Sequence, residues 1–454
     1  MKLKQVEITH FRCFESLQIE LQPDVNVVVG VNAAGKSAML DAISCALNSV
    51  LRAITADWIG KEQYQATALR PEDLHVDFDG EESTENYIRV FASIVDYYSV
   101  QNFKSINEKG ESNAIEWSED IFRKSDDWLF IQKPKRINKL SVYIDIFNRL
   151  IKNNKKEFIP CPVIAYYRSS RHISVMPELG DMTRLKLDRH MAYEHALDAG
   201  SNYQAIFQWF YIRENQELRA RQRQLCPEFP DLRAVRAALR IMLEHVDQVY
   251  IDGNPPTLMV SFTADSQRQA PMSLAQLSDG YRHLLVLVLD FARRLALANP
   301  NSDNPLEAPG ILLIDEIDLH LHPKWQQRVI PNLRRTFPNT QIIATTHSPQ
   351  ILTTIHPRNI IILKDQRVFT PTSSTFGAES SRTMREIMGA EDRPPDNENA
   401  QAIIDLFALI HRAEYEAAQT RCLELRQRIG ADEPALIEAD TIIKNRLWEK
   451  EVGL

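Results

Sequence analysis

The stretch VNVVVGVNAAGKSAML, residues 25–40, decides the fold of this chain. Val25–Val29 is a short, mostly β-branched run of the kind that forms a buried strand, and it stops at Gly30. Apolar residues then recur with helical spacing over Ala38–Leu51. The pattern therefore predicts a strand, a glycine-containing loop and a helix, in that order.

The loop itself, GVNAAGKS, fits the phosphate-binding pattern GxxxxGK[ST] in full. Gly30 and Gly35 let the backbone turn so that its N–H groups face phosphates, with Asn32 between them at the nucleotide. Lys36 would place a positive charge at the β- and γ-phosphates, and Ser37 would offer its hydroxyl to Mg²⁺. An ordinary glycine turn is the alternative, but the preceding strand and following helix are what the phosphate-binding reading requires. The loop predicts ATP and Mg²⁺ as ligands.

A second buried strand ends in two acids. Ile311–Ile314 is followed by Asp315 and Glu316, which would point into the ligand crevice of an open α/β sheet. Asp315 would hold the Mg²⁺ shell, and Glu316 would polarise the attacking water as a general base. The alternative is a strand that ends in a solvated loop. With the helix Trp325–Phe337 and the strand Gln341–Ala344 it forms a βαβ unit, so we expect an α/β architecture.

Two shorter motifs are weaker when taken singly. In LSDGY, Ser278 and Gly280 stand before the apolar helix Leu284–Leu297, where they could present a hydroxyl and an N–H to a phosphate. A simple helix N-cap explains the same residues. His347 follows the strand Gln341–Ala344 and could donate a hydrogen bond to a γ-phosphate, although a histidine there is more often structural.

The joint order of these motifs carries a family resemblance. Phosphate loop, LSDGY, ILLIDE and TTHSP follow one another as in ABC ATPases, and the sequence resembles the SMC/Rad50/RecF-like ABC ATPases over residues ~1–50 and ~270–365. ITHFRCFESLQIEL looks like their first lobe. IDEIDLHLHP and TTHSP look like the variants of bacterial defence ATPases and overcoming-lysogenization-type proteins. The resemblance implies an ABC-type ATPase head with mixed sheets around the phosphate-loop helix.

The resemblance also implies roles in an assembly of two copies. Ser278 and Gly280 of one copy would close over ATP bound to the Lys36 loop of the other. Asp318 would lie near the dimer seam, and Arg12 would approach a phosphate.

Some features are left open by the sequence. His320 and His322 stand two apart, where one could join the seam or the two could suggest a metal. The glutamine that relatives place at the metal has no clear counterpart, because Gln63 and Gln65 are poor candidates. The run PVIAYYRSSR (162–171) suggests a phosphate or nucleic-acid contact or a nucleotide clamp, or else a strand whose end forms ion pairs within the fold. LRARQR (218–223) suggests a similar contact, or a solvated helix face.

The rest of the chain suggests four parts. The predicted parts are a first ATPase lobe (1–170), a helical insertion in place of a coiled-coil arm (171–250), a second lobe (251–370), and a linker with a helical tail (371–454). The tail holds the predicted helices Ala400–Leu425 and Glu433–Trp448. Residues 52–160 are polar and irregular, and Lys104–Asp120 has the composition of an exposed insertion.

Composition limits the function classes. The net charge of −8 argues against a protein whose task is to coat DNA, and five scattered cysteines give neither a disulfide framework nor a zinc spacing. The chain has no uninterrupted apolar run long enough for a membrane span, so we expect a cytoplasmic protein.

The family resemblance also suggests a biological role. Overcoming-lysogenization-type nucleases carry a metal-binding domain after the ATPase, whereas residues beyond 370 have the composition of linker and helix. We therefore expect no nuclease site here. The chain looks like the ATPase subunit of Septu-type anti-phage systems, whose relatives also accompany some retrons. The resemblance implies a homo-oligomer, a separate HNH nuclease partner, and nucleic acid contacted through the complex.

Two other functions remain open. One is a self-sufficient nuclease with an acidic site in 52–160, where Asp73, Asp77 and Asp79 lie. The other is a DNA-repair ATPase of the RecF type.

Overall fold

The computed structural model describes most of the chain in two compact units. The described residues are 1–55, 69–75, 87–95, 114–124, 127–130, 160–169, 188–201, 203–225, 228–264, 267–268, 270–390, 393–394 and 396–452. The units are Met1–Ser380 and Ser381–Leu454, and each is described by itself. All the predicted site residues belong to the first unit.

A six-stranded sheet forms the centre of the first unit. Its order is β15–β14–β3–β13–β12–β7, and all pairs are parallel except that of β15 with β14. The strands are β3 (Val25–Val29), β7 (Val163–Tyr167), β12 (Gly310–Ile314), β13 (Thr340–Thr345), β14 (Ile360–Lys364) and β15 (Arg367–Phe369). Every residue of β3, β7, β12 and β13 is buried, as expected for parallel strands covered on both faces. The predicted α/β class is confirmed.

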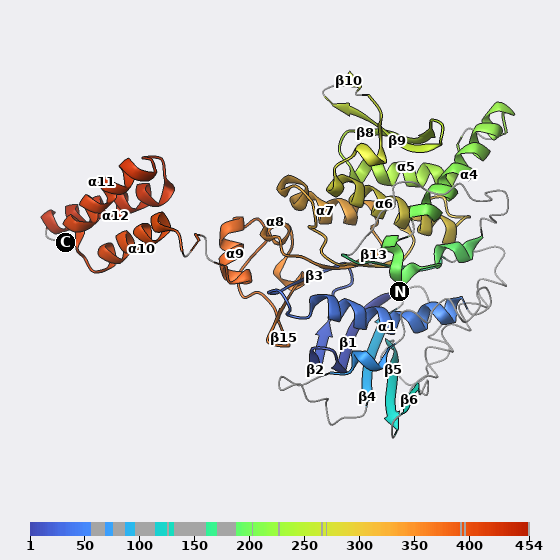
Figure 1. Ribbon diagram of the computed structural model, residues 1–454, viewed down its shortest axis with the longest axis horizontal. Coiled ribbons are helices and arrows are strands. Elements are labelled where there is room, and N and C mark those ends of the chain that lie inside the picture. The colour runs from blue at the N-terminus through green and yellow to red at the C-terminus, as the bar shows by residue number, and fades with distance from the viewer. Residues whose placement is uncertain are drawn as a thin grey trace. The chain divides into compact units, whose positions relative to one another are not determined.

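Helix α1 (Lys36–Ile54) lies between this sheet and a five-stranded antiparallel sheet, as Figure 1 shows. The antiparallel strands are β2 (Phe14–Glu20), β1 (Lys2–Phe11), β4 (Tyr87–Val95), β5 (Ala114–Lys124) and β6 (Asp127–Phe130), in that spatial order. The indole N–H of Trp117 donates to the Ala46 carbonyl at 3.0 Å and fixes α1 to the antiparallel sheet. Among the described helices, α1 alone has the length and hydropathy of a membrane span, but most of it is buried in this core.

Helices and a small sheet make up the other side of the unit (Figure 1). The helices are α4 (Tyr203–Gln222), α5 (Pro230–Met242), α6 (Asp279–Ala298), α7 (Pro323–Thr336) and the single turn α8 (Pro349–Leu352). The strands are β8 (Val246–Asp252), β9 (Thr257–Ala264), β10 (Gln267–Arg268) and β11 (Met272–Ser273). The rings of Phe291 on α6 and Phe337 after α7 meet edge to face, with centroids 4.9 Å apart.

Three sequence predictions about this unit are wrong. Residues 52–160 are not simply irregular, since β4, β5 and β6 come from them. Of the predicted exposed insertion Lys104–Asp120, residues 114–120 lie in β5, with Ile115 and Trp117 buried, while 104–113 lie outside the described residues. Charged residues that alternate with these apolar ones hid a strand with one solvated face. The helical spacing of apolar residues over Leu232–Val246 predicts one helix, but α5 ends at Met242 and Val246 begins β8.

The second unit is a set of helices with a core of its own. It contains most of α9 (Ser380–Met388), then α10 (Glu398–His411), α11 (Tyr415–Ile429) and α12 (Pro434–Val452). The helix predicted over Ala400–Leu425 is two helices, because the chain turns at Ala413, whose φ is 61°. Buried apolar side chains of α10, α11 and α12 form one cluster, which includes Leu406, Leu425 and Leu436. The apolar faces of these helices therefore pack against one another.

Candidate nucleotide site

The loop between β3 and α1 needs its two glycines. A Cβ on Gly30 would lie 2.4 Å from the Leu363 carbonyl oxygen. Gly35, the N-cap of α1, has φ 93°, and a Cβ there would lie 2.5 Å from the Cys13 sulfur. Between them the exposed Asn32 lies at the loop tip. The loop therefore has the tight turn and close approach that a phosphate cradle at a helix N-terminus requires.

Lys36 places its charge inside this loop. Its ammonium donates to the carbonyl oxygens of Gly30 at 3.0 Å and Val31 at 2.9 Å. Burial lowers the pKa of Lys36, and the negative charges of Asp315 and Glu316, among others, act in the opposite direction. A cation enclosed by loop carbonyls and faced by carboxylates fits a site that receives phosphates and a metal ion.

Ser37 and Asp315 meet across the site. The Ser37 hydroxyl donates to Asp315 Oδ2 at 2.9 Å, and the Thr345 hydroxyl donates to Asp315 Oδ1 at 2.7 Å. Asp315 is only 3% exposed, so two hydroxyls hold its carboxylate in place. A hydroxyl and a carboxylate in contact are the hard oxygen donors that Mg²⁺ prefers, and these residues fit the metal that the loop predicts.

Glu316 follows in an unusual backbone conformation. Its φ is 49°, in the left-handed region, and its N–H donates to the Thr345 hydroxyl at 2.7 Å. Such a conformation costs a β-carbon-bearing residue about 1–3 kcal/mol and clusters at functional sites. Arg12, Ala33 and His320 share this feature, and all lie in or beside the predicted motifs.

Asp318 fixes the segment after β13 in its own chain. Its carboxylate accepts from the Thr346 hydroxyl at 2.6 Å and from the His347 backbone N–H at 3.2 Å. Thr346 in turn donates its own N–H to the Val28 carbonyl of β3. His347 is thus positioned at the carboxyl edge of the same parallel sheet as Asp315.

The signature residues lie at the start of α6. Ser278 is exposed, and its side chain makes no capping bond to the helix. A Cβ on Gly280 would lie 2.2 Å from the His320 carbonyl oxygen, so the segment after Glu316 approaches α6 closely within one chain. The His320 ring stacks on the His283 ring, with centroids 5.7 Å apart. His322 accepts a hydrogen bond from the Lys324 backbone N–H at the start of α7. Both histidines therefore have structural contacts.

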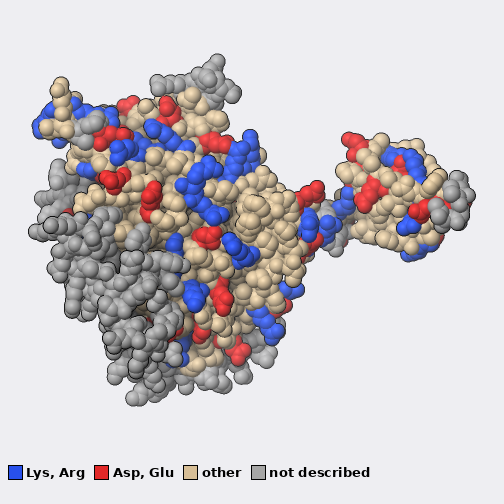
Figure 2. Space-filling model, turned by 180° about the vertical axis from the view of Figure 1, so that it is seen from behind, with Lys and Arg blue, Asp and Glu red and all other residues tan. Residues whose placement is uncertain are grey.

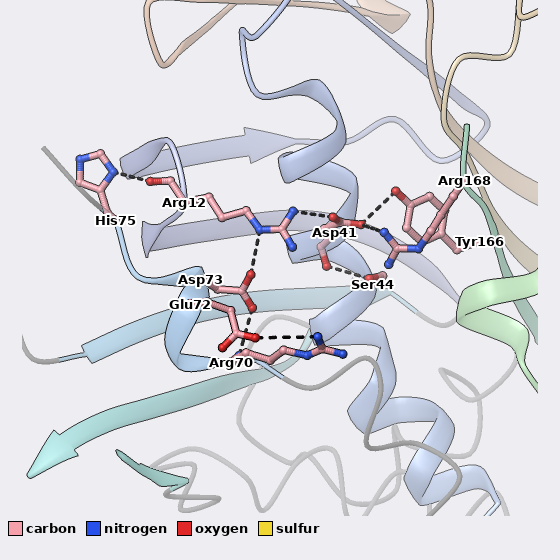
Figure 3. A network of polar contacts seen from close by, with 9 residues as sticks. All are labelled: Arg12, Asp41, Ser44, Arg70, Glu72, Asp73, His75, Tyr166 and Arg168. Atoms are coloured by element: carbon pink, nitrogen blue, oxygen red, sulfur yellow. Dashed lines mark hydrogen bonds and ion pairs between the residues drawn. The ribbon is translucent and has the colours of Figure 1, made fainter. Parts of the chain in front are cut away.

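Arg12 is held by two carboxylates rather than left in solvent. Its guanidinium donates to Asp41 at 2.6 Å and Asp73 at 2.8 Å. Burial opposes this charge, but the two carboxylates raise the pKa of Arg12 overall. Asp41, on α1, also accepts from the hydroxyl of Tyr166 and from Arg168, so the network joins four segments of the chain (Figure 3).

Sequence reasoning missed several of these partners. A partner for Asp41 could have been predicted from the sequence. Asp41 stands four residues after Ser37 on a helix that is expected to be buried, where an unpaired acid is costly. Thr345 and Thr346 belong to the quoted TTHSP run, but their hydroxyl contacts depend on how β13 lies beside β12. Gln63, Gln65 and Arg171 lie outside the described residues, as do Asp77 and Asp79 of the alternative nuclease site.

Comparison with known families places this site within one match. A family model described as "AAA domain, putative AbiEii toxin, Type IV TA system" matches residues 25–353. The match begins at β3 and ends just after His347, so it contains the phosphate loop, the signature, the acidic strand end and the histidine.

Individual relatives align over very different lengths. "Retron Ec83 probable ATPase" of Escherichia coli is 27% identical, with 99% of this chain and 88% of that protein covered. "Retron Vc95 probable ATPase" of Vibrio cholerae serotype O1 biovar El Tor is 23% identical, with 94% of this chain and 87% of that protein covered. "Septu protein PtuA" of Bacillus mycoides (strain KBAB4) is 33% identical, but over only 27% of this chain and 18% of that protein. The predicted likeness to Septu ATPases is thus matched over a minor part of the chain.

Proposed function

The chain belongs to the family of AAA-domain proteins described as putative AbiEii toxin, Type IV TA system, and on that premise we propose that two copies of it enclose Mg²⁺-ATP and hydrolyse it. We propose that it is an ATPase of the SMC/RecF-like ABC class, and its match to an AAA-domain family and its alignment over almost its whole length with probable ATPases support this. The observation that carries the proposal is the contact between Ser37 and Asp315 beside the loop that holds Lys36. That arrangement provides a phosphate cradle and two oxygen donors for a metal ion in one place.

Each residue has a defined task in this proposal. The loop N–H groups and Lys36 bind the phosphates, and Ser37 and Asp315 would hold Mg²⁺, which neutralises phosphate charge when bound. Glu316 takes the proton of the attacking water. His347, fixed through its backbone, donates to the γ-phosphate.

The second copy completes the site through its signature. Ser278 is exposed and does not cap its own helix, so its hydroxyl can donate to a γ-phosphate bound by another chain. Gly280 adds a backbone N–H at the positive end of α6. Asp318 accepts from the His347 backbone N–H and stands two residues before His320, whose carbonyl oxygen approaches Gly280, and we propose that it lies close to the seam between copies.

We propose that ATP occupancy controls a separate HNH nuclease in anti-phage defence. Support comes from the retron ATPases, which align with almost the whole chain, and from the shorter match to a Septu protein. The second unit is a candidate docking or assembly surface. Figure 2 shows basic and acidic side chains interspersed on the face in view, and we propose that nucleic acid is contacted through the complex.

Lys36→Ala tests the nucleotide site directly. We expect the parent chain to bind Mg²⁺-ATP in isothermal calorimetry and Lys36→Ala to show no binding, because the variant loses the cation at the β- and γ-phosphates. Lys324→Ala, an exposed lysine at the start of α7, is the matched control and should bind as the parent does. Unchanged ATP affinity in Lys36→Ala would reject the site.

The partner is tested by adding it. The purified chain is incubated with Mg²⁺, ATP and one of three nucleic-acid substrates: plasmid DNA, phage nucleic acid or transfer RNA. Each incubation is done with this chain as the single protein and again with the product of a neighbouring nuclease gene added. Phosphate release alone, and cutting only with the partner, support the proposal. Cutting by the pure chain that is lost in Asp73→Ala, Asp77→Ala or Asp79→Ala variants would make this chain the nuclease.

A further inference from the structure

Arg168 lies at the same edge of the sheet as Asp315 of the proposed metal position. β7 and β12 are parallel neighbours with Tyr167 opposite Ile314, and the Asp315 N–H donates to the Tyr167 carbonyl at 2.8 Å. Arg168 and Asp315 are therefore the first residues beyond the ends of two adjacent strands. Carboxyl ends of parallel strands are where an open α/β sheet binds its ligand.

The side chain of Arg168 reaches the same face of α1 as the metal-site serine. It donates to Asp41, which follows Ser37 by four residues on the helix. Residues so spaced lie about 5–6 Å apart on one helix face. Two contacts thus run side by side from α1 to the strand ends, Ser37 to Asp315 and Asp41 to Arg168. A guanidinium is held one helical turn from the proposed Mg²⁺ position.

Asp41 can release this arginine at a small cost. Its carboxylate also accepts from Arg12 at 2.6 Å and from the Tyr166 hydroxyl at 3.1 Å, so it would remain paired without Arg168 (Figure 3). The Arg168 side chain is 34% exposed, so solvent reaches it, and its guanidinium lies over the Tyr166 ring, 4.6 Å from the ring centroid. A γ-phosphate offers more negative charge and a better bidentate acceptor than a carboxylate already shared by two other donors.

We propose that Arg168 is a γ-phosphate-binding residue, and that Asp41 holds it beside the site until Mg²⁺-ATP is bound. This inference rests on the proposed function, since it adds a ligand to the same nucleotide site. Arg168 distinguishes ATP from ADP, because only ATP draws the guanidinium from Asp41. In this proposal the run PVIAYYRSSR supplies both an ion pair within the fold and a phosphate contact.

The first test compares two nucleotides on the full-length chain. Calorimetry measures the affinity of Arg168→Ala for Mg²⁺ with a non-hydrolysable ATP analogue and for Mg²⁺-ADP. We expect affinity for the analogue to fall about tenfold to a hundredfold, the usual effect of losing a charged hydrogen bond, with ADP affinity nearly unchanged. Arg168→Lys keeps the charge and should retain part of the preference for the analogue.

Asp41→Asn should change the affinity for the ATP analogue in the opposite direction, upward. If Asp41 competes with the γ-phosphate for Arg168, a neutral amide competes less, and affinity for the analogue should rise about threefold relative to ADP. A purely structural ion pair predicts instead that Asp41→Asn and Arg168→Ala weaken binding together.

The matched control is the ion pair of Arg89 with Asp120. It joins β4 and β5 at 2.8 Å, and its side chains are 44% and 9% exposed, close to the values for Arg168 and Asp41. Arg89→Ala should lower the melting temperature as much as Arg168→Ala does, yet keep the parental ratio of analogue to ADP affinity. An unchanged ratio in Arg168→Ala, in a parent that binds the analogue, would overturn this inference alone. A parent that binds neither nucleotide would overturn the proposed function as well.

Discussion

At the scale of single residues, the site combines a fixed acid with a strained one. Asp315 is held by two hydroxyls, whereas Glu316 beside it has a left-handed backbone conformation with a φ of 49°. We predict that Glu316→Gln binds Mg²⁺-ATP at parental affinity but hydrolyses it about 10²–10⁴ times more slowly, because the general base is lost. Phosphate release measures the rate, with the exposed Glu307→Gln as control. Parental turnover in Glu316→Gln would refute the assignment.

Glu119 on β5 gives a residue-scale prediction about pH. Burial raises its pKa from 4.5 to about 7, with Arg52 opposing and Asp120 reinforcing the shift. A carboxyl whose folded pKa is raised contributes stability that is complete below pH 4.5 and is lost as pH rises through 7. Urea unfolding should therefore show the parent losing stability relative to Glu119→Gln between about pH 4.5 and pH 7. Parallel pH profiles for the two proteins would show that the shift is absent.

At the scale of elements, β7 ties the two sides of the sheet together. Its adjacent tyrosines point to opposite faces, as strand geometry requires. The Tyr166 hydroxyl donates to Asp41 on α1, and the Tyr167 hydroxyl donates to Asp290 on α6 at 2.8 Å. The phosphate-loop helix and the signature helix are thus anchored to one strand.

The anchor on α6 predicts a large effect on stability. Asp290 is fully buried and pairs with Arg293 and Arg294, so that the two guanidinium charges hold its pKa below the usual range despite burial. Asp290→Ala should lower the free energy of unfolding by about 3–5 kcal/mol, because two buried arginines lose their partner. Tyr167→Phe removes one hydrogen bond and should cost only about 1 kcal/mol. Equal costs for the two variants in urea unfolding would contradict this account.

Elements also show where sequence reasoning worked. The phosphate loop and strands β3, β12 and β13 could be predicted because buried parallel strands are continuous apolar runs with sharp ends. β5 could not, because its buried residues alternate with charges on a solvated face. The break at Ala413 was missed as well, since the helical apolar pattern continues across it and no glycine or proline marks the turn. For the site, the motif residues could be named from sequence, but the sharing of Asp41 depends on four segments meeting in space.

At the scale of the whole molecule, the proposed nucleotide-binding residues and the helical tail belong to different units. The first unit contains every residue assigned to the nucleotide, and the second is a helical unit whose core is built from its own helices. The proposed ATP site is complete only when the signature of one copy meets the phosphate loop of another. Hydrolysis and assembly are therefore coupled in this account.

Mixing two inactive variants tests that claim most directly. Lys36→Ala keeps an intact signature, and Ser278→Arg keeps an intact phosphate loop, so a mixed dimer has one complete site. Each variant alone should hydrolyse almost no ATP, and an equimolar mixture should recover about one quarter of the parental rate, since half of randomly paired dimers are mixed. Recovery near that level would support a site shared between copies. A mixture no more active than its components, or a Ser278→Arg chain that hydrolyses ATP at the parental rate alone, would contradict it.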